Sequence, residues 1–252
     1  MPLVSVITPM YNAAPYIISA YRSLLEQSFS DFEWLVSDDC STDGGADLLE
    51  QAAKGDERVK IERLAQNVGP VGARNAALRR AKGRYVAYLD ADDLWLPEKL
   101  AKQIEHMRRT SAPLSYTAYR KINQNGALRS QNKIRVPAMV SFTGLLRTCH
   151  ICASSAMFDR ELTGNILEDE SVPAPKNDYH MWLSILSRFP YAYGLNEDLV
   201  RLRVFSESLT GNKVYAAKEQ WKYYRRVWRF SVFKSLFFFG NYAVNGLLRY
   251  LK

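Results

Sequence analysis

The chain has 252 residues, of which 47% are hydrophobic and 12% aromatic, and this composition excludes an intrinsically disordered protein. No apolar run reaches the length of a spanning helix, and three cysteines do not suggest a disulfide framework, so we expect a reducing cytoplasm. The net charge of +8 is uneven, because residues 218–252 contain eight basic residues and one acidic residue whereas the rest of the chain is nearly neutral.

The first 110 residues alternate between predicted strands and predicted helices. Short apolar runs that end in polar turns indicate strands, and apolar residues spaced three and four apart indicate helices. The predicted pairs of strand and helix cover residues 4–8 and 14–28, 32–37 and 41–54, 58–64 and 69–83, and 84–90 and 96–109. This alternation predicts an α/β fold with a mostly parallel sheet, in which ligands bind beyond the carboxyl ends of the strands.

After about residue 112 the alternation stops. Residues 114–122 and 127–136 flank Asn125–Gly126 and predict a hairpin. The remaining predicted elements are a strand over 152–159, a helix over 177–189, a strand over 198–205 and helical structure from about residue 212.

The turn after the first strand, PMYNAAP at residues 9–15, contains no glycine. A dinucleotide fold needs a glycine-rich turn at this point so that the backbone can approach a pyrophosphate, and the chain has no GxxxxGK[ST] loop either. If this unit handles a nucleotide, another group must neutralise the phosphates. A divalent metal held by carboxylates can do so.

Three carboxylates follow the fourth predicted strand, at Asp90, Asp92 and Asp93. Alternate residues at a strand end can direct two carboxylates to one ion, and Mg²⁺ or Mn²⁺ prefers such oxygen ligands. Asp90 and Asp92 are therefore candidate metal ligands. The alternative is a solvated turn in which Asp92 or Asp93 caps the next helix.

Four segments occur in the order that is typical of one enzyme family. They are VSVITPMYN, FEWLVSDDCSTDGG, NVGPVGARNAALRRAKGRYVAYLDADDLWLPEKL and NDYHMWLSIL. Over about residues 3–205 the chain resembles family 2 glycosyltransferases with the GT-A fold. The resemblance implies an inverting transfer of a hexosyl or N-acetylhexosaminyl group from a nucleotide-diphosphate sugar to a saccharide acceptor, in the synthesis of O-antigen, capsule or exopolysaccharide.

The resemblance also implies roles for individual residues. Asp39, with Asp38 beside it, would accept a hydrogen bond from the uracil ring of a UDP-sugar, and Asp90 and Asp92 would bind ribose and Mn²⁺ or Mg²⁺. The residues implied around the nucleoside are Pro9, Tyr11 and Arg74. The chain departs from the family at Cys40, where the family often has glycine.

An inverting transfer needs one general base, because the acceptor hydroxyl is a poor nucleophile until its proton leaves. By resemblance the base is Asp178, which matches the Asp of the family's acidic-Asp-Tyr-x-x-Trp motif, although Asn177 stands where an acid is commoner. The alternative is that Asp178 is a first-turn acid that stabilises the helix dipole. The base would then lie elsewhere, with Glu168, Asp169 and Glu170 as the candidates.

Two residues near these motifs have open interpretations. Trp182 lies one turn after Asp178, and core packing is favoured over stacking on a sugar. Arg203 could reach the diphosphate or could be an ordinary surface arginine.

Two other classes of function stay open. A sugar-phosphate nucleotidyltransferase has a similar nucleotide domain, but the chain lacks a glycine-rich, basic phosphate loop after the first strand. A nucleic-acid-binding module is suggested by the basic tail, but the body carries an acidic site that would repel phosphates without a metal. We therefore expect a nucleotide-sugar donor and no nucleic-acid partner.

The tail mixes lysine and arginine with many aromatic residues, and its longest charge-free run, residues 235–248, is too short to span a bilayer. An amphipathic helix lying in the plane of the cytoplasmic membrane face fits better, with a lipid-linked acceptor as the reason for membrane contact. The alternative is that the aromatic residues pack onto the body. We expect a catalytic domain over residues 1–211, with a nucleotide-binding half (1–110) and an acceptor half (111–211), and a tail over 212–252.

Overall fold

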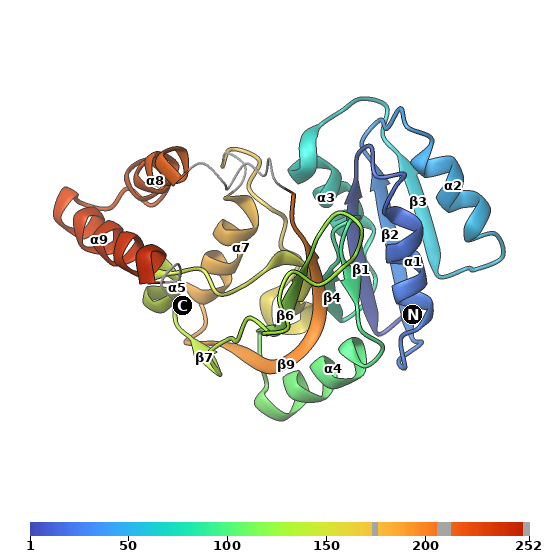
Figure 1. The fold of residues 1–252 in the computed structure, drawn as a ribbon. Coiled ribbons are helices and arrows are strands. Elements are labelled where there is room, and N and C mark those ends of the chain that lie inside the picture. The colour runs from blue at the N-terminus through green and yellow to red at the C-terminus, as the bar shows by residue number, and fades with distance from the viewer. Residues whose placement is uncertain (173–175, 206–212, 249–252) are drawn as a thin grey trace.

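The computed structural model describes residues 1–172, 176–205 and 213–248, without the side chains of residues 213–216 and 245–248. One mixed sheet runs through the molecule, with helices on both faces and a pair of helices at one end (Figure 1). Its strands lie in the order β3-β2-β1-β4-β8-β6-β9-β5, and β7 pairs with β9.

The first half of the sheet is parallel, which confirms the prediction from the alternating pattern. β1 pairs with both β2 and β4, and β2 pairs with β3, all in parallel register. The strands are β1 (Val4–Met10), β2 (Phe32–Asp38), β3 (Val59–Arg63) and β4 (Tyr85–Tyr88). The helices are α1 (Ile17–Leu25), α2 (Gly45–Ala52), α3 (Gly69–Arg80) and α4 (Lys99–Thr110).

The second half is mixed. β8 is antiparallel to β4 and to β6, whereas β9 is parallel to β6 and antiparallel to β5 and β7. The strands are β5 (Leu94–Trp95), β6 (Leu114–Ile122), β7 (Met139–Val140), β8 (Met157–Asp159) and β9 (Ala192–Arg203). The helices are α5 (Phe142–Arg147), a 3₁₀ turn (Ala153–Ser155), α6 (Arg160–Thr163) and α7 (Asn177–Leu186).

Alternate residues of the buried strands face two different apolar cores, as the period of a strand requires. Val4 and Val6 of β1 lie in a core with Leu24 of α1 and Ile104 of α4, whereas Ile7 faces a second core. The second core contains side chains of α3, α5 and α7. Because both faces of the central strands are covered, their carboxyl ends form the accessible edge of this half of the sheet.

The predicted hairpin forms only in part. The turn closes, with the Asn123 N–H bonded to the Ala127 carbonyl oxygen and Gly126 at φ +84. Residues 127–136 nevertheless form no strand, since they meet β6 only at two isolated bridges, Tyr119–Ile134 and Ile122–Leu128. This part of the prediction is wrong. The segment is mostly polar and exposed, so no buried face fixes a register against β6.

Two other predicted strands have different bounds. The strand predicted at 198–205 begins at Ala192. Its first half is not predicted because it contains Gly194 and Asn196, which are uncommon in strands. The strand predicted at 152–159 is a 3₁₀ turn followed by the short β8.

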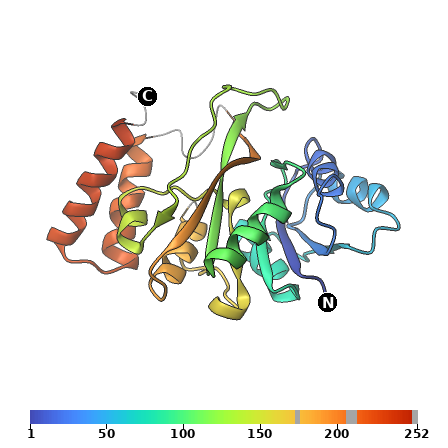
Figure 2. The same cartoon turned by 90° about the horizontal axis from the view of Figure 1, so that it is seen from below.

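The tail consists of α8 (Lys213–Lys222), a π-helical turn (Tyr223–Val227) and α9 (Val232–Leu248). Figure 2 shows α8 and α9 side by side at the end of the molecule opposite the N-terminal half. Tyr223, Tyr224, Phe230 and Phe238 are buried in the second core, and the Tyr224 hydroxyl donates to the Leu146 carbonyl oxygen of α5. Among the described residues no helix combines the length and the hydropathy that crossing a bilayer requires.

Candidate active site

A cleft of about 480 Å³ opens at the carboxyl ends of β1 and β4. Five of the site residues predicted from the sequence line this cleft: Pro9, Tyr11, Arg74, Asp90 and Asp92. They come from the end of β1 and the turn after it, from α3 and from the turn after β4. The fold therefore brings into one cleft side chains that are up to 83 positions apart in the chain.

Asp38 ends the neighbouring strand β2 and Asp39 follows it, and both are buried. Asp38 accepts a hydrogen bond from the Ser41 hydroxyl, so its carboxylate is used within its own turn. Asp39 is fixed from two sides: its N–H donates to the Met10 carbonyl oxygen, and its Oδ1 accepts from the Val68 N–H at 2.7 Å. Oδ2 of Asp39 has no polar partner within the described part of the chain, which leaves it free for a ligand.

Cys40 adopts a φ of +62, in the left-handed region that favours glycine. Its thiol donates to the Leu64 carbonyl oxygen at 3.0 Å. The chain therefore keeps, with a cysteine, the backbone conformation for which the resembling family often uses glycine.

The three carboxylates after β4 divide into two kinds. Asp93 is buried, and it accepts hydrogen bonds from the Arg203 N–H at 2.7 Å and from the Ser154 hydroxyl at 2.5 Å. Ser154 Oγ in turn accepts the Asp90 N–H at 3.0 Å. Asp93 thus anchors the turn, whereas Asp90 and Asp92 line the cleft.

Arg203 supports the same turn from β9. Its Nε donates to the Asp92 carbonyl oxygen at 2.7 Å, its Nη1 donates to the carbonyl oxygens of Asn123 and Gln124, and its guanidinium lies 4.7 Å from the centre of the Tyr16 ring. The side chain is buried, so the interpretation as an ordinary surface arginine is wrong.

The two carboxylates in the cleft suit a cation that completes its ligand shell with phosphate oxygens. The described residues contain no group of three or more His, Cys, Asp or Glu side chains that could hold a metal alone. Mg²⁺ usually binds through one or two carboxylates and the phosphates of its substrate. Burial, together with repulsion from Asp90, raises the pKa of Asp92 to about 6. A cation would relieve that repulsion, so the residues fit the predicted metal.

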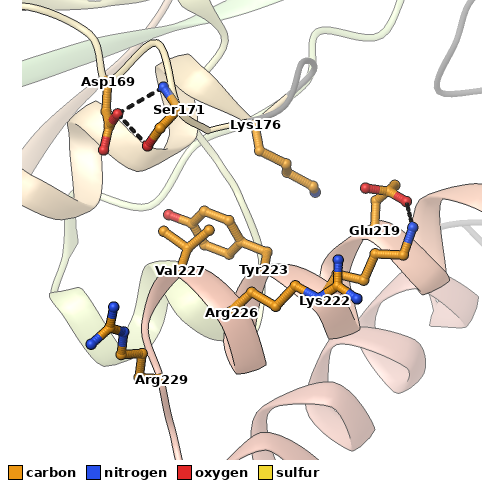
Figure 3. Close-up of a pocket in the computed structure, with 9 residues that line it drawn as sticks. All are labelled: Asp169, Ser171, Lys176, Glu219, Lys222, Tyr223, Arg226, Val227 and Arg229. Atoms are coloured by element: carbon orange, nitrogen blue, oxygen red, sulfur yellow. Dashed lines mark hydrogen bonds and ion pairs between the residues drawn. The ribbon is translucent and has the colours of Figure 1, made fainter.

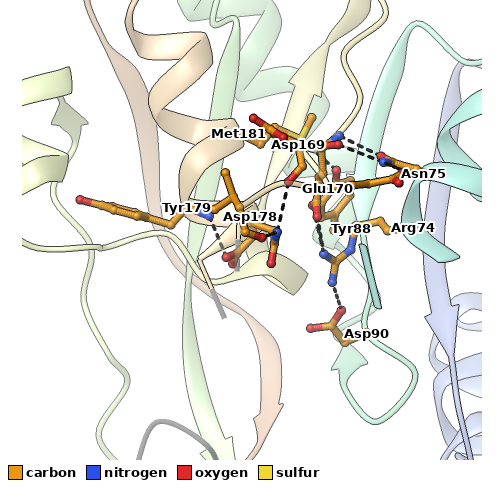
Figure 4. A network of polar contacts seen from close by, with 12 residues as sticks. Arg74, Asn75, Tyr88, Asp90, Asp169, Glu170, Asp178, Tyr179 and Met181 are labelled. Carbon is orange, nitrogen blue, oxygen red and sulfur yellow. Dashed lines mark hydrogen bonds and ion pairs between the residues drawn. The ribbon is translucent and has the colours of Figure 1, made fainter. Parts of the chain in front are cut away.

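Arg74 joins the cleft to the second half of the protein. Its Nη1 lies 3.0 Å from both carboxylate oxygens of Glu168, and its Nη2 lies 3.3 Å from Asp90 Oδ1. Figure 4 shows Arg74 pointing toward Asp90 beside Tyr88, whose ring centre is 5.1 Å from the guanidinium. Burial alone would lower the pKa of Arg74, but the carboxylates of Glu168 and Asp90 raise it. The guanidinium therefore stays charged.

Asp178 lies in the first turn of α7, where its Oδ1 accepts the Tyr179 N–H at 2.7 Å. Burial raises the pKa of Asp178, the charge of Arg74 opposes this shift, and Asp90 adds to it. The carboxylate is therefore within electrostatic range of the cleft. Asn177 donates to the carbonyl oxygens of Asp169 and Val172, which an ionised acid at this position could not do.

The other three candidate bases are engaged in polar contacts of their own. Glu168 is paired with Arg74, Asp169 accepts from Ser171, and Glu170 accepts from Asn75. Asp178 alone among the four is bonded only to its neighbouring N–H within the residues that the structure describes. Trp182 is fully buried and contacts Tyr88, which confirms the prediction of core packing.

Comparison with known proteins gives a consistent result. The family model described as Glycosyl transferase family 2 matches residues 5–167. The putative teichuronic acid biosynthesis glycosyltransferase TuaG of Bacillus subtilis is 41% identical over 250 residues, covering 99% of this chain and 98% of that protein. The UDP-Glc:α-D-GlcNAc-diphosphoundecaprenol β-1,3-glucosyltransferase WfgD of Escherichia coli is 34% identical over 222 residues, covering 87% and 84%.

A solved structure shares the fold. The crystal structure of residues 1–349 of TarS from S. aureus in complex with UDP-GlcNAc superposes with a TM-score of 0.72 at 20% identity. The match covers 96% of this chain and 72% of that one.

The Arg74–Glu168 pair yields a test of stability. Replacing Arg74 by Met leaves the fully buried Glu168 carboxylate without its partner, and we expect a loss of about 3 kcal/mol in the free energy of unfolding at pH 7. Burial already raises the pKa of Glu168, and the loss of Arg74 raises it further. The folded variant then binds a proton that the unfolded chain has lost, so its deficit should be smaller at pH 5 than at pH 7.

Urea unfolding at both pH values measures this difference. The control is Arg79→Met, on the same helix, whose side chain is 57% exposed and lies 3.7 Å from Glu170. It should change stability little. Equal unfolding midpoints for Arg74→Met and the wild type would show that the pair is not stabilising.

Proposed function

This chain belongs to glycosyl transferase family 2 and is a glycosyltransferase with the GT-A fold, and we propose that it moves a hexosyl or N-acetylhexosaminyl group from a UDP-sugar, with inversion, to a saccharide on a lipid diphosphate. The observation that carries the proposal is the convergence of Asp90, Asp92 and Arg74 on one cleft, with Asp178 within electrostatic range. Family membership disfavours the nucleotidyltransferase and the nucleic-acid-binding module.

The names of the two relatives support the choice of substrates. TuaG is named for teichuronic acid biosynthesis, and WfgD is named for transfer from UDP-Glc to a sugar on diphosphoundecaprenol. Both chains are covered over most of their length. We infer that this protein acts in the synthesis of a bacterial surface polysaccharide.

The donor nucleotide would occupy the cleft. Oδ2 of Asp39 would accept the N–H of a uracil ring, with Asp38 maintaining the adjacent turn. Tyr11 and Pro9 line the cleft beside Arg74, and the exposed Tyr11 ring is available to contact the nucleoside. Asp90 and Asp92 would hold Mn²⁺ or Mg²⁺, which when bound supplies positive charge to the departing nucleotide diphosphate.

Asp178 would act as the general base. It would accept the proton of the acceptor hydroxyl while the oxygen forms a bond to the anomeric carbon and the bond from that carbon to the diphosphate breaks on the opposite face. The product has the inverted configuration, the nucleotide diphosphate leaves with the bonding electrons, and the proton stays on Asp178. The raised pKa of this carboxyl brings it closer to the working pH, where a general base is most effective.

We also propose that α9 contacts the cytoplasmic face of the membrane. The aromatic residues of the tail divide into two sets, and one set is buried in the body. The other side of α9 leaves Phe233 86% exposed, and Leu236, Phe237 and Val244 are each more than half exposed. An apolar helix face with basic neighbours suits the boundary of an anionic bilayer, where a lipid-linked acceptor resides.

The metal proposal predicts the behaviour of Asp92→Ala. We expect it to abolish transfer and to weaken UDP binding in Mn²⁺, because the cation loses a carboxylate ligand. In EDTA the variant and the wild type should bind UDP about equally poorly. Calorimetry and UDP release measure both effects. The control Asp31→Ala removes an exposed carboxylate away from the cleft, and full wild-type activity in EDTA would refute the proposal.

The base assignment predicts the behaviour of Asp178→Asn. Removing a general base should lower kcat by about 10²- to 10⁴-fold while UDP affinity hardly changes. In the wild type, kcat should fall as the pH drops through the raised pKa of Asp178, because the protonated carboxyl cannot accept a proton. The control is Glu170→Gln, an exposed acid in the neighbouring loop. Near wild-type turnover of Asp178→Asn would contradict the assignment.

The membrane proposal predicts the behaviour of Phe233→Ser/Phe237→Ser. The wild type should float with phosphatidylglycerol vesicles at low salt, and the double variant should bind them at least about tenfold more weakly, because two apolar rings no longer enter the bilayer. The matched control is Leu25→Ser/Leu48→Ser, which alters two half-exposed apolar residues of α1 and α2 at the other end of the molecule. A wild-type protein that does not float would refute membrane contact.

A further inference from the structure

A second cavity lies between the segment before α7 and the tail. Its volume is also about 480 Å³, and it shares no lining residue with the donor cleft. Figure 3 shows side chains of the segment that contains Asp169 and Ser171 facing those of α8 and the π-helical turn. The charged residues that line it are Lys176, Lys222, Arg226, Arg229, Asp169 and Glu219.

The charges in this cavity leave a positive excess. Glu219 is paired with Lys222 at 2.6 Å, and Asp169 accepts hydrogen bonds from the N–H and the hydroxyl of Ser171. Arg226 and Arg229 are exposed and have no polar partner within the described ranges. Four cations against two carboxylates leave about two unmatched positive charges.

The cavity is shaped by fixed contacts. The Lys176 Nζ donates to Gln220 Oε1 at 2.6 Å, which ties the start of α7 to α8. The Tyr223 hydroxyl accepts from Trp228 Nε1 at 2.8 Å and lies 2.9 Å from His180 Nδ1. These contacts join the start of α7 to the tail, so the cavity is bounded by two elements of the structure.

The cavity also lies beside the proposed base. Lys176, which lines the cavity, precedes Asp178 by two residues, and the ring of Tyr223, which also lines it, lies 5.3 Å from the ring of Tyr179, the residue after Asp178. A ligand anchored here by its anionic part could therefore extend an attached sugar toward Asp178, whereas the donor nucleotide approaches from the other cleft.

We propose that this basic cavity binds the diphosphate group of the lipid-linked acceptor, mainly through Arg226 and Arg229. The proposal rests on the proposed function, because it supplies the recognition site for that acceptor. A diphosphate diester carries two negative charges, and this equals the excess of about two positive charges in the cavity. The planar guanidinium forms paired hydrogen bonds to phosphate oxygens, and this makes arginine well suited to such a group.

Farnesyl diphosphate, with farnesol as its uncharged counterpart, is the probe for the test. Binding is measured by calorimetry in saturating UDP and Mn²⁺, so that the donor cleft is blocked. The wild type should bind farnesyl diphosphate and not farnesol. Arg226→Gln/Arg229→Gln should weaken binding by about 100-fold, about tenfold for each charge-assisted hydrogen bond lost.

The matched control is Arg108→Gln/Arg109→Gln, which removes the same charge from exposed positions on α4. It should bind farnesyl diphosphate as the wild type does. Equal affinity of the Arg226/Arg229 variant and the wild type would overturn the proposal, as would equal binding of farnesol and farnesyl diphosphate by the wild type.

Two further measurements distinguish a failure of this proposal from a failure of the proposed function. Flotation with phosphatidylglycerol vesicles tests bilayer headgroups as the ligand, and a variant that loses flotation but keeps its affinity for farnesyl diphosphate would overturn the proposal in favour of the headgroups. UDP binding in Mn²⁺ tests the proposed function separately. UDP binding that is retained in the Arg226/Arg229 variant also shows that the variant is folded.

Discussion

The arrangement of the two halves depends on the contacts of the buried Arg74 guanidinium. It extends from α3 of the parallel half and pairs with Glu168, which is fully buried in the other half, while it also reaches Asp90 at the edge of the cleft. Asn75 reinforces the junction, because its side chain exchanges two hydrogen bonds with the backbone of Glu168. A charge removed from water at such a junction is stable only while its partner stays in place. The same contact therefore holds the fold together and positions a carboxylate of the cleft.

The cluster of carboxylates after β4 contains one buried acid, Asp93, and two half-buried acids, Asp90 and Asp92, and these have different roles. A buried carboxylate such as that of Asp93 is uncommon, but it accepts two hydrogen bonds, one from the Arg203 N–H of β9 and one from the Ser154 hydroxyl. Arg203 completes this support by binding the Asp92 carbonyl oxygen. The turn is thereby rigid, so Asp90 and Asp92 can remain close to each other in spite of their repulsion. Such pre-organisation reduces the reordering that binding of a cation and a diphosphate would otherwise require.

Much of the parallel half could be predicted from sequence, because its signals are local. Short apolar runs define β1 and β2, and polar residues at the strand ends mark the cleft. Contacts between distant segments could not be predicted in this way. Arg203 is an arginine in an alternating strand, and nothing near it in sequence indicates that it binds a turn 111 positions earlier. The strand predicted after Asn125–Gly126 does not form, for the opposite reason. The turn signal is local and correct, but the residues that follow have no apolar face that could be buried against β6.

The tail has two surfaces with different purposes. Tyr223, Tyr224 and Phe238 face the second core and fix the tail against α5 and α7, whereas Phe233 and Phe237 face outward. Composition alone could not separate these sets, because both are aromatic and interleaved with cations. The attachment has a further consequence. Since the buried tyrosines hold the π-helical turn against α7, the cations of that turn are carried to the side of the molecule where Asp178 lies. The basic character of the tail therefore contributes to a cavity of the body as well as to its surface.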